Sequence, residues 1–194
     1  MHTISDNLRL DKRRALPDEI AFLRAKYPAP QWATHGNYGE LAAFWLQVHD
    51  ALREEGRALG QATEDFREGR TDMAAFQRVF AVRLRGYLQH LEGHHRIEDA
   101  HYFPRFRRLD ERLVYGFDLL ENDHEIIHGQ LLAVVESAQA FMQDLARGGD
   151  AMRYGADAYA ERAGRLLALL EQHLADEEEI VIPTILEHSE RPFR

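Results

Sequence analysis

One set of four residues occurs twice in this chain, with the same internal spacing both times. Each member of the second set follows its counterpart by 79 positions, and such self-similarity predicts two structurally similar halves. The first set is His49, His94, Glu98 and Pro104, and the second is His128, His173, Glu177 and Pro183. The fold must therefore accommodate two copies of one polar arrangement.

Each half of this repeat is centred on a turn signal. In both halves 45 positions separate the two histidines, and the midpoints fall near Gly69-Arg70-Thr71 and Gly149-Asp150. Glycine commonly ends a helix and opens a turn. In each half, this spacing predicts two antiparallel helices, with one histidine on each helix at the same level of the bundle.

Apolar residues recur at three- and four-residue steps along most of the chain, as amphipathic helices require. Four helices are predicted: from Tyr38 to a break at Glu68, from a cap at Thr71-Asp72 towards Pro104, through Phe117 to Gly148, and on to about His188. No segment alternates with period two over the length of a strand. We expect an all-α fold, an up-down-up-down antiparallel four-helix bundle.

The first 35 residues lack this periodicity. We interpret residues 1–35 as an N-terminal arm on a surface path, with room for a short helix over Asp18–Tyr27 that Pro28 and Pro30 would stop. Residues 36–190 are the predicted bundle domain. The arm is assigned no chemistry.

The repeated residues are of metal-binding types. His94 and Glu98, His173 and Glu177, and also His124 and His128 are four positions apart, so each pair lies on one helix face about one turn apart. Imidazole suits iron, copper, nickel and zinc, and a carboxylate can bridge two ions. Seven ligands exceed the needs of one ion, so a two-metal site is predicted, with the ligands His49, His94, Glu98, His124, His128, His173 and Glu177.

The repeat fails at one informative position. His124 corresponds to Trp45, so one metal ion would have three histidines and the other two. With shared carboxylates and a bridging oxygen, the second ion keeps an open coordination position, where a small ligand can bind.

This pattern of a lone His, HxxxE, HxxxH and a last His followed by a carboxylate resembles the hemerythrin family over roughly residues 40–188. The resemblance implies two non-haem iron ions with an oxo or hydroxo bridge. It implies that His124, His128 and His173 hold one iron, that His49 and His94 hold the other, and that Glu98 and Glu177 bridge them. Oxygen, nitric oxide or peroxide would then approach the second iron. Oxygen-carrying members differ in having an aspartate one residue beyond the position of Glu177.

The composition limits the other functions. The absence of cysteine excludes disulfides, thiolate metal sites and cysteine nucleophiles. With 24 Lys+Arg against 33 Asp+Glu, the formal charge of −9 argues against nucleic acid and anionic membrane surfaces as partners. No apolar run has the length of a signal peptide or a membrane span, so a cytoplasmic location is expected. Pairing of two copies is left open.

Several helical residues outside the set of seven ligands are expected to be structural or to lie near the site. His95 has no histidine counterpart in the repeat and is expected to face outward, whereas His90 is a candidate to line the site. The acidic run 176–179 is interpreted as a solvated face, apart from Glu177. Trp45 is expected to lie beside the open position.

Three functions remain for such a site. The first is reversible binding or sensing of oxygen or nitric oxide without turnover. The second is a peroxidase, an oxidase or a nitric-oxide-reducing enzyme, and the third is iron storage or repair. A ferritin-like site is disfavoured because its Glu-x-x-His pairs fall on the wrong helices. Residues 124–128, HEIIH, match the HExxH zinc motif, but a zinc hydrolase is disfavoured because both of these histidines belong to the set of seven ligands.

Overall fold

The computed structural model describes residues 2–193, and every regular element among them is helical. The long helices are α1 (Glu40–Arg67), α2 (Met73–Ile97), α4 (Val114–Arg147) and α5 (Gly149–His188), and α3 (Phe103–Phe106) is a single turn. The short elements are η1 (Asp6–Leu8), η2 (Ala29–Thr34), η3 (Glu98–Tyr102), η4 (Glu111–Leu113) and η5 (Arg191–Phe193). The all-α prediction is confirmed.

The helix ends lie where the turn residues predicted them. Gly69 follows α1 with a φ of 73°, and Gly148 follows α4 with a φ of 68°, values that glycine adopts without steric cost. The Asp72 carboxylate accepts a hydrogen bond of 2.8 Å from the Ala75 backbone N–H and so caps α2.

The chain forms two compact units, and each long helix contributes residues to both. Unit 1 comprises Met1–Asp50, His94–Ile126 and Glu171–Arg194, and unit 2 comprises Ala51–Gly93 and Ile127–Leu170. The predicted boundary between arm and bundle, near residue 35, lies within unit 1.

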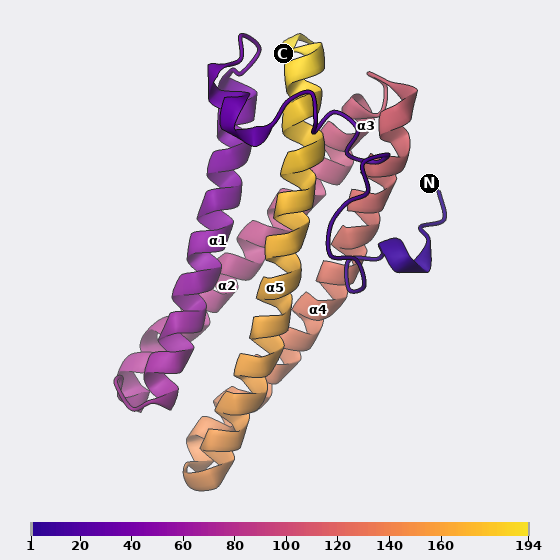
Figure 1. Cartoon of the computed structure of the whole chain (residues 1–194). Coiled ribbons are helices and arrows are strands. Elements are labelled where there is room, and N and C mark those ends of the chain that lie inside the picture. The colour runs from indigo at the N-terminus through magenta and orange to yellow at the C-terminus, as the bar shows by residue number, and fades with distance from the viewer. Residues whose placement is uncertain (1, 194) are drawn as a thin grey trace. The chain divides into compact units, whose positions relative to one another are not determined.

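The hydrophobic core of unit 1 includes part of the arm. Leu16, Ile20 and Ala21 pack with apolar residues from the first half of α4 and the second half of α5. Figure 1 shows this indigo segment crossing α5 and α4. The predicted surface path is therefore wrong for these residues.

The short helix expected over Asp18–Tyr27 does not form. This segment consists of successive turns, for example from the Ala21 N–H to the Pro17 carbonyl and from the Tyr27 N–H to the Leu23 carbonyl. Packing of Ile20, Ala21 and Leu23 into the interior overrides the weak local helical pattern.

The core of unit 2 is aromatic. Phe76 and Phe80 stack with ring centroids 4.7 Å apart, and Phe66, Phe141 and Tyr159 complete the cluster. Such pairs add stability beyond the area they bury.

A wide helical turn follows α2. Element η3 is π-helical, and the N–H of Phe103 bonds to the carbonyl of Glu98, five residues earlier. Pro104 has no N–H and would clash with the carbonyl four residues before it, so the wider turn accommodates this proline. The repeat counterpart Pro183 lies inside α5, which continues to His188.

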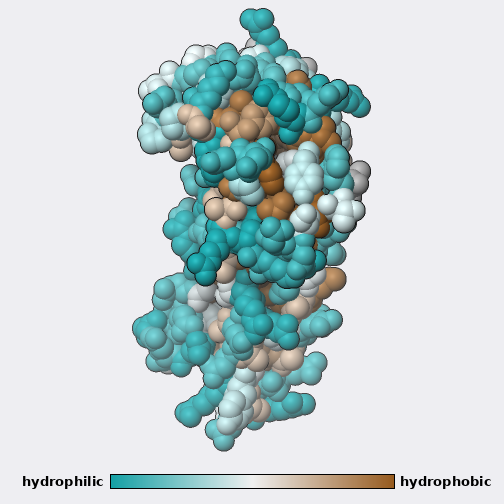
Figure 2. All heavy atoms as spheres, turned by 45° about the vertical axis from the view of Figure 1, so that its right-hand side comes forward, coloured by the Kyte–Doolittle hydropathy of each residue, from teal (hydrophilic) through white to brown (hydrophobic). Residues whose placement is uncertain are grey.

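The face drawn in Figure 2 is mostly hydrophilic, as expected for helices whose apolar stripes face inward. Among residues 2–193, no helix combines the length and the apolar character needed to cross a membrane.

The start of α1 is capped from the other end of the chain. Oε1 of Glu190 accepts hydrogen bonds from the backbone N–H groups of Leu41, at 2.8 Å, and Ala42, at 3.1 Å. A Cβ atom at Gly39 would lie 2.6 Å from Oε2 of the same carboxylate. Only glycine at position 39 leaves room for this cap.

Gly39→Ala should therefore displace the Glu190 carboxylate and lower the free energy of unfolding by about 1 kcal/mol, the usual contribution of a helix cap. Urea unfolding followed by circular dichroism would measure the change. Gly36→Ala is the matched control, because nothing lies within 4 Å of a Cβ at that position. Equal stability of the two variants would contradict the assignment of this cap.

Candidate metal centre

Seven histidine and glutamate side chains form two adjoining groups in unit 1. Each group could hold a metal ion, because one ligand atom from every member lies within 4.8 Å of those of the others. The first group is His95, His124 and His173, and the second is His49, His94, Glu98 and Glu177. Six of the seven sequence-predicted ligands are thus brought together, and His128 is not.

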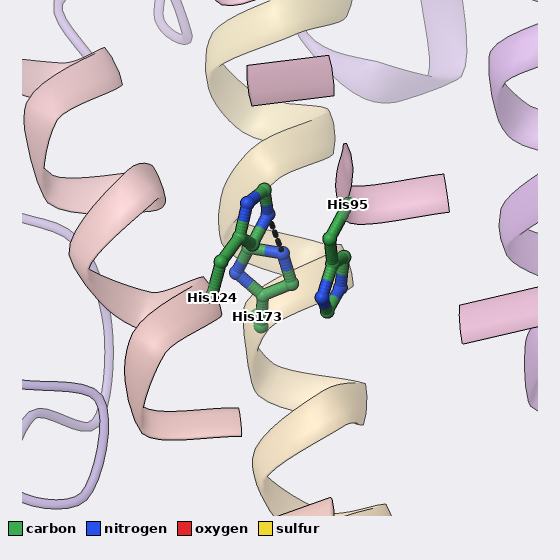
Figure 3. Close-up of side chains that lie close together, drawn as sticks. All are labelled: His95, His124 and His173. Atoms are coloured by element: carbon green, nitrogen blue, oxygen red, sulfur yellow. Dashed lines mark hydrogen bonds between the residues drawn. The ribbon is translucent and has the colours of Figure 1, made fainter. Parts of the chain in front are cut away.

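The three imidazoles of the first group come from α2, α4 and α5 (Figure 3). Nε2 of His124 lies 3.1 Å from Nε2 of His173, and the His95 ring stacks on His124 with centroids 4.0 Å apart. Two nitrogens bound to one ion at about 2.1 Å are roughly 3.0–3.4 Å apart in tetrahedral or octahedral geometry. The separation of these two nitrogens suits a shared ion.

The second group lies where α1, α2, η3 and α5 meet. The His49 and His94 rings are 5.2 Å apart, edge to face. Nε2 of His94 lies 3.2 Å from Oε1 of Glu98, and Nε2 of His49 lies 3.5 Å from Oε1 of Glu177.

Both carboxylates also reach the first group. Oε2 of Glu98 lies 3.7 Å from Nε2 of His124, and Oε2 of Glu177 lies 3.1 Å from Nε2 of His173. Each glutamate therefore presents one oxygen to each group, the arrangement that a carboxylate shared between two ions requires.

These short contacts are not aligned as hydrogen bonds. Among the described residues, no hydrogen-bond partner exists for Nε2 of His49, His94 and His95 or for Oε2 of Glu98 and Glu177. Buried polar atoms without partners are rare because each loses its hydration without compensation. Cations at the centre of the cluster would satisfy these lone pairs, so the residues present fit metal ions.

In two histidines of the cluster, the ring nitrogen that faces away from the cluster contacts a carboxylate. Nδ1 of His49 lies 2.9 Å from Oε1 of Glu178, and Nδ1 of His124 lies 2.8 Å from Oδ1 of Asp99. Metal-binding histidines usually donate their second N–H to such an acceptor, which fixes the tautomer and the ring orientation. The interpretation of Glu178 as part of a solvated face is therefore wrong.

Burial and mutual charge shift the pKa values of the histidines. Burial, with the charges of neighbouring histidines, lowers the pKa of His94 to about 3 and that of His95 well below its usual value. Burial would also lower the pKa of His173, but the carboxylates of Asp123 and Glu177 raise it to about 9.

The two glutamates shift in opposite directions. Burial and the charge of Glu177 raise the pKa of Glu98 well above its usual value. Burial opposes ionisation of Glu177, but the charges of His49 and His173 outweigh it and lower the pKa. Without a cation, protons compensate the buried carboxylates, and metal binding would displace them.

His128 was wrongly expected to join the cluster. Its side chain is 52% exposed, and its Nδ1 lies 3.1 Å from Oε2 of Glu92 at the surface of unit 2. His90 likewise contacts Glu55 in unit 2 and belongs to neither group. The HxxxH spacing of His124 and His128 permits a shared ion but does not require one.

His95 occupies a place in the cluster instead, and the expectation that it faces outward is wrong. Its side chain is buried beside His124 and His173. Adjacent positions on a helix can face two different neighbours, so His94 points to His49 of α1 while His95 points to His124 of α4. The sequence signal was present, since His95 follows the core residue Leu91 by four and precedes Glu98 by three.

Trp45 supplies a further contact to the cluster. Its indole Nε1–H donates a hydrogen bond of 2.8 Å to Oε1 of Glu177, the oxygen that faces His49. The Tyr102 ring packs edge-on at 5.0 Å from the indole. The indole is buried and borders the second group, as the asymmetry of the repeat predicted.

Comparisons with known proteins give one match. No curated protein and no solved structure matches the chain significantly. A family model described as the hemerythrin HHE cation binding domain matches residues 40–186, which include all members of both groups. This match covers well over half of the chain, and its description agrees with the chemistry of the cluster. The chain therefore belongs to the hemerythrin HHE cation-binding domain family.

Proposed function

We propose that this chain holds two non-haem iron ions in the buried cluster and binds oxygen, nitric oxide or peroxide at one of them. The observation that carries the proposal is that Glu98 and Glu177 each present one oxygen to each histidine group. Three histidines would serve the first ion and two would serve the second. With both carboxylates shared, the second ion would have one protein ligand fewer, which would leave room for an external ligand.

The residues of the chain have distinct roles in this proposal. His95, His124 and His173 would bind one ion and His49 and His94 the other. Two irons would supply coordination and electron exchange for the small ligand. The buried indole of Trp45 would limit the access of water to the second ion and orient Glu177.

We favour binding over turnover as the biological role. Acid–base chemistry on a substrate needs a titratable group that is free to act, whereas every titratable residue of the cluster is assigned to an ion here. We also propose that the four long helices form the up-down-up-down bundle typical of such centres.

Metal analysis with visible spectra tests this function. We expect two irons per chain and a visible band that appears with oxygen and disappears on its removal from anaerobically reduced protein. Irreversible oxidation with turnover of added peroxide would assign the chain to the enzymes instead. Protein that takes up no iron under anaerobic reconstitution would refute the metal centre.

A pair of variants distinguishes the cluster from the HxxxH pattern. His95→Ala should reduce iron affinity by more than about tenfold, since loss of an outer partner alone has that effect. His128→Ala should retain the wild-type iron content, because that side chain is exposed. Metal analysis after dialysis against a weak chelator measures both, and the opposite result would restore His128 as a ligand.

Replacement of Trp45 tests its place beside the open position. Trp45→Phe removes the N–H donor to Glu177 and part of the barrier to water, so iron content should persist while the autoxidation rate changes by about tenfold or more. Phe44→Leu, at the neighbouring but 56% exposed position, is the control. Identical autoxidation of the Trp45 variant and the wild type would place the open position elsewhere.

A further inference from the structure

The N-terminal arm inserts an arginine into the interior of unit 1. The side chain of Arg13 is 2% exposed and contacts two buried aspartates, Asp123 of α4 and Asp176 of α5. Its Nε donates to Oδ2 of Asp176 at 2.8 Å, its Nη1 donates to Oδ1 of Asp123 at 2.8 Å, and its Nη2 contacts Oδ2 of Asp123. The guanidinium thus grips Asp123 with two nitrogens, the strongest geometry for this type of pair.

The arm around Arg13 is itself anchored. Nη1 of Arg13 also donates to the Leu8 carbonyl at 2.8 Å, and the amide of Gln172 on α5 donates to the Arg13 carbonyl at 2.8 Å. Backbone and side chain are therefore both fixed. The position of Asp123 depends on a residue from outside the region that matches the family, which begins at residue 40.

Asp123 connects this contact to the metal centre. Its Oδ2 lies 3.5 Å from Nδ1 of His173, and both side chains are fully buried. On the other side of the ring, Nε2 of His173 lies 3.1 Å from Nε2 of His124. Among the described residues, Nδ1 of His173 has no hydrogen-bond partner at this separation, which is long for such a bond. A small shift would let its N–H donate to Asp123.

A contribution to the stability of the fold does not by itself explain why Arg13 is buried with two aspartates. Arg13 is one basic group shared between two acidic ones, Asp123 and Asp176, and all three side chains are buried. Buried ion pairs add little net stability compared with apolar residues of similar size. The group therefore calls for a role beyond stability, and Asp123, which contacts His173, provides one.

We propose that Arg13 is a positioning residue of the metal centre. It holds the Asp123 carboxylate beside Nδ1 of His173, in the orientation from which the carboxylate can accept the imidazole N–H. The ring then presents Nε2 to the metal ion. The arm thereby contributes to metal affinity without touching the ion. This inference rests on the proposed metal centre.

Cobalt(II) binding to the full chain tests the proposal, with affinity measured by chelator competition and coordination by the visible spectrum. Arg13→Met should weaken cobalt binding by about 10–100-fold and shift the visible bands, as loss of an outer partner does elsewhere. Arg24→Met is the control, because Arg24 also joins the arm to α5 through Glu179 and is 32% exposed. It should lower the thermal stability of the metal-free protein while leaving cobalt affinity and spectrum unchanged.

A double-mutant cycle with Asp123→Asn identifies the route of the effect. If Arg13 acts through Asp123, Arg13→Met should change cobalt affinity by less than about threefold in the Asp123→Asn background. Arg13→Lys, which keeps the charge but loses the two-nitrogen grip, should bind cobalt with intermediate affinity and replaces Arg13→Met if that variant does not fold.

Wild-type cobalt affinity and spectrum in the Arg13 variant, or an equal effect of Arg13→Met in both backgrounds, would overturn the proposal. A wild-type chain that binds neither cobalt nor iron would instead refute the metal centre itself, so the two failures are distinguishable.

Discussion

The burial of imidazoles and carboxylates at one place in unit 1 is the constraint on which the rest of this structure depends. Protons or cations can compensate their inward-facing atoms, several of which have no hydrogen-bond partner among residues 2–193. Each histidine must therefore present Nε2 to the centre, and Glu178 and Asp99 hold two of the rings in that orientation through Nδ1. A residue that touches no ion can thus still determine whether the site binds one.

The same constraint explains the irregular end of α2. Glu98 must reach both histidine groups, and it is also the first residue of the π-helical turn η3. A π turn inserts an extra residue into the helix and so rotates the residues after it relative to those before it. His94 and His95 keep their inward positions before the turn, while Phe103 packs near His124 after it, with ring centroids 5.4 Å apart. The turn that accommodates Pro104 therefore also keeps the apolar residues beyond Glu98 in register with the core.

The sequence predicted the class of fold and most of the cluster because both depend on periodicity. Helical spacing determines which residues share a face, and the 79-residue repeat selected His49, His94, Glu98, His173 and Glu177 among the many polar residues of those faces. The same repeat failed for His95 and His128. A repeat detects only what both halves retain, and His95 has a leucine as its counterpart. His128 has a histidine counterpart, but the side chain of His95 from α2 completes the three-histidine group, so α4 contributes only His124.

The role of the arm could not be predicted from the sequence, and the reason is physical. Arg13 meets Asp123 and Asp176 across 110 and 163 positions of chain, in a segment of single turns without periodicity. Such a contact depends on one side chain reaching one site, so no pattern in its neighbours signals it. The interiors of the two units differ in a way that explains the importance of this contact. Unit 2 is stabilised by aromatic packing among residues such as Phe76, Phe80 and Phe141. The interior of unit 1 instead contains buried charged side chains, which lower the stability of the fold unless they are paired. Arg13 of the arm pairs with the carboxylates of Asp123 and Asp176, and so keeps Asp123 buried in contact with His173.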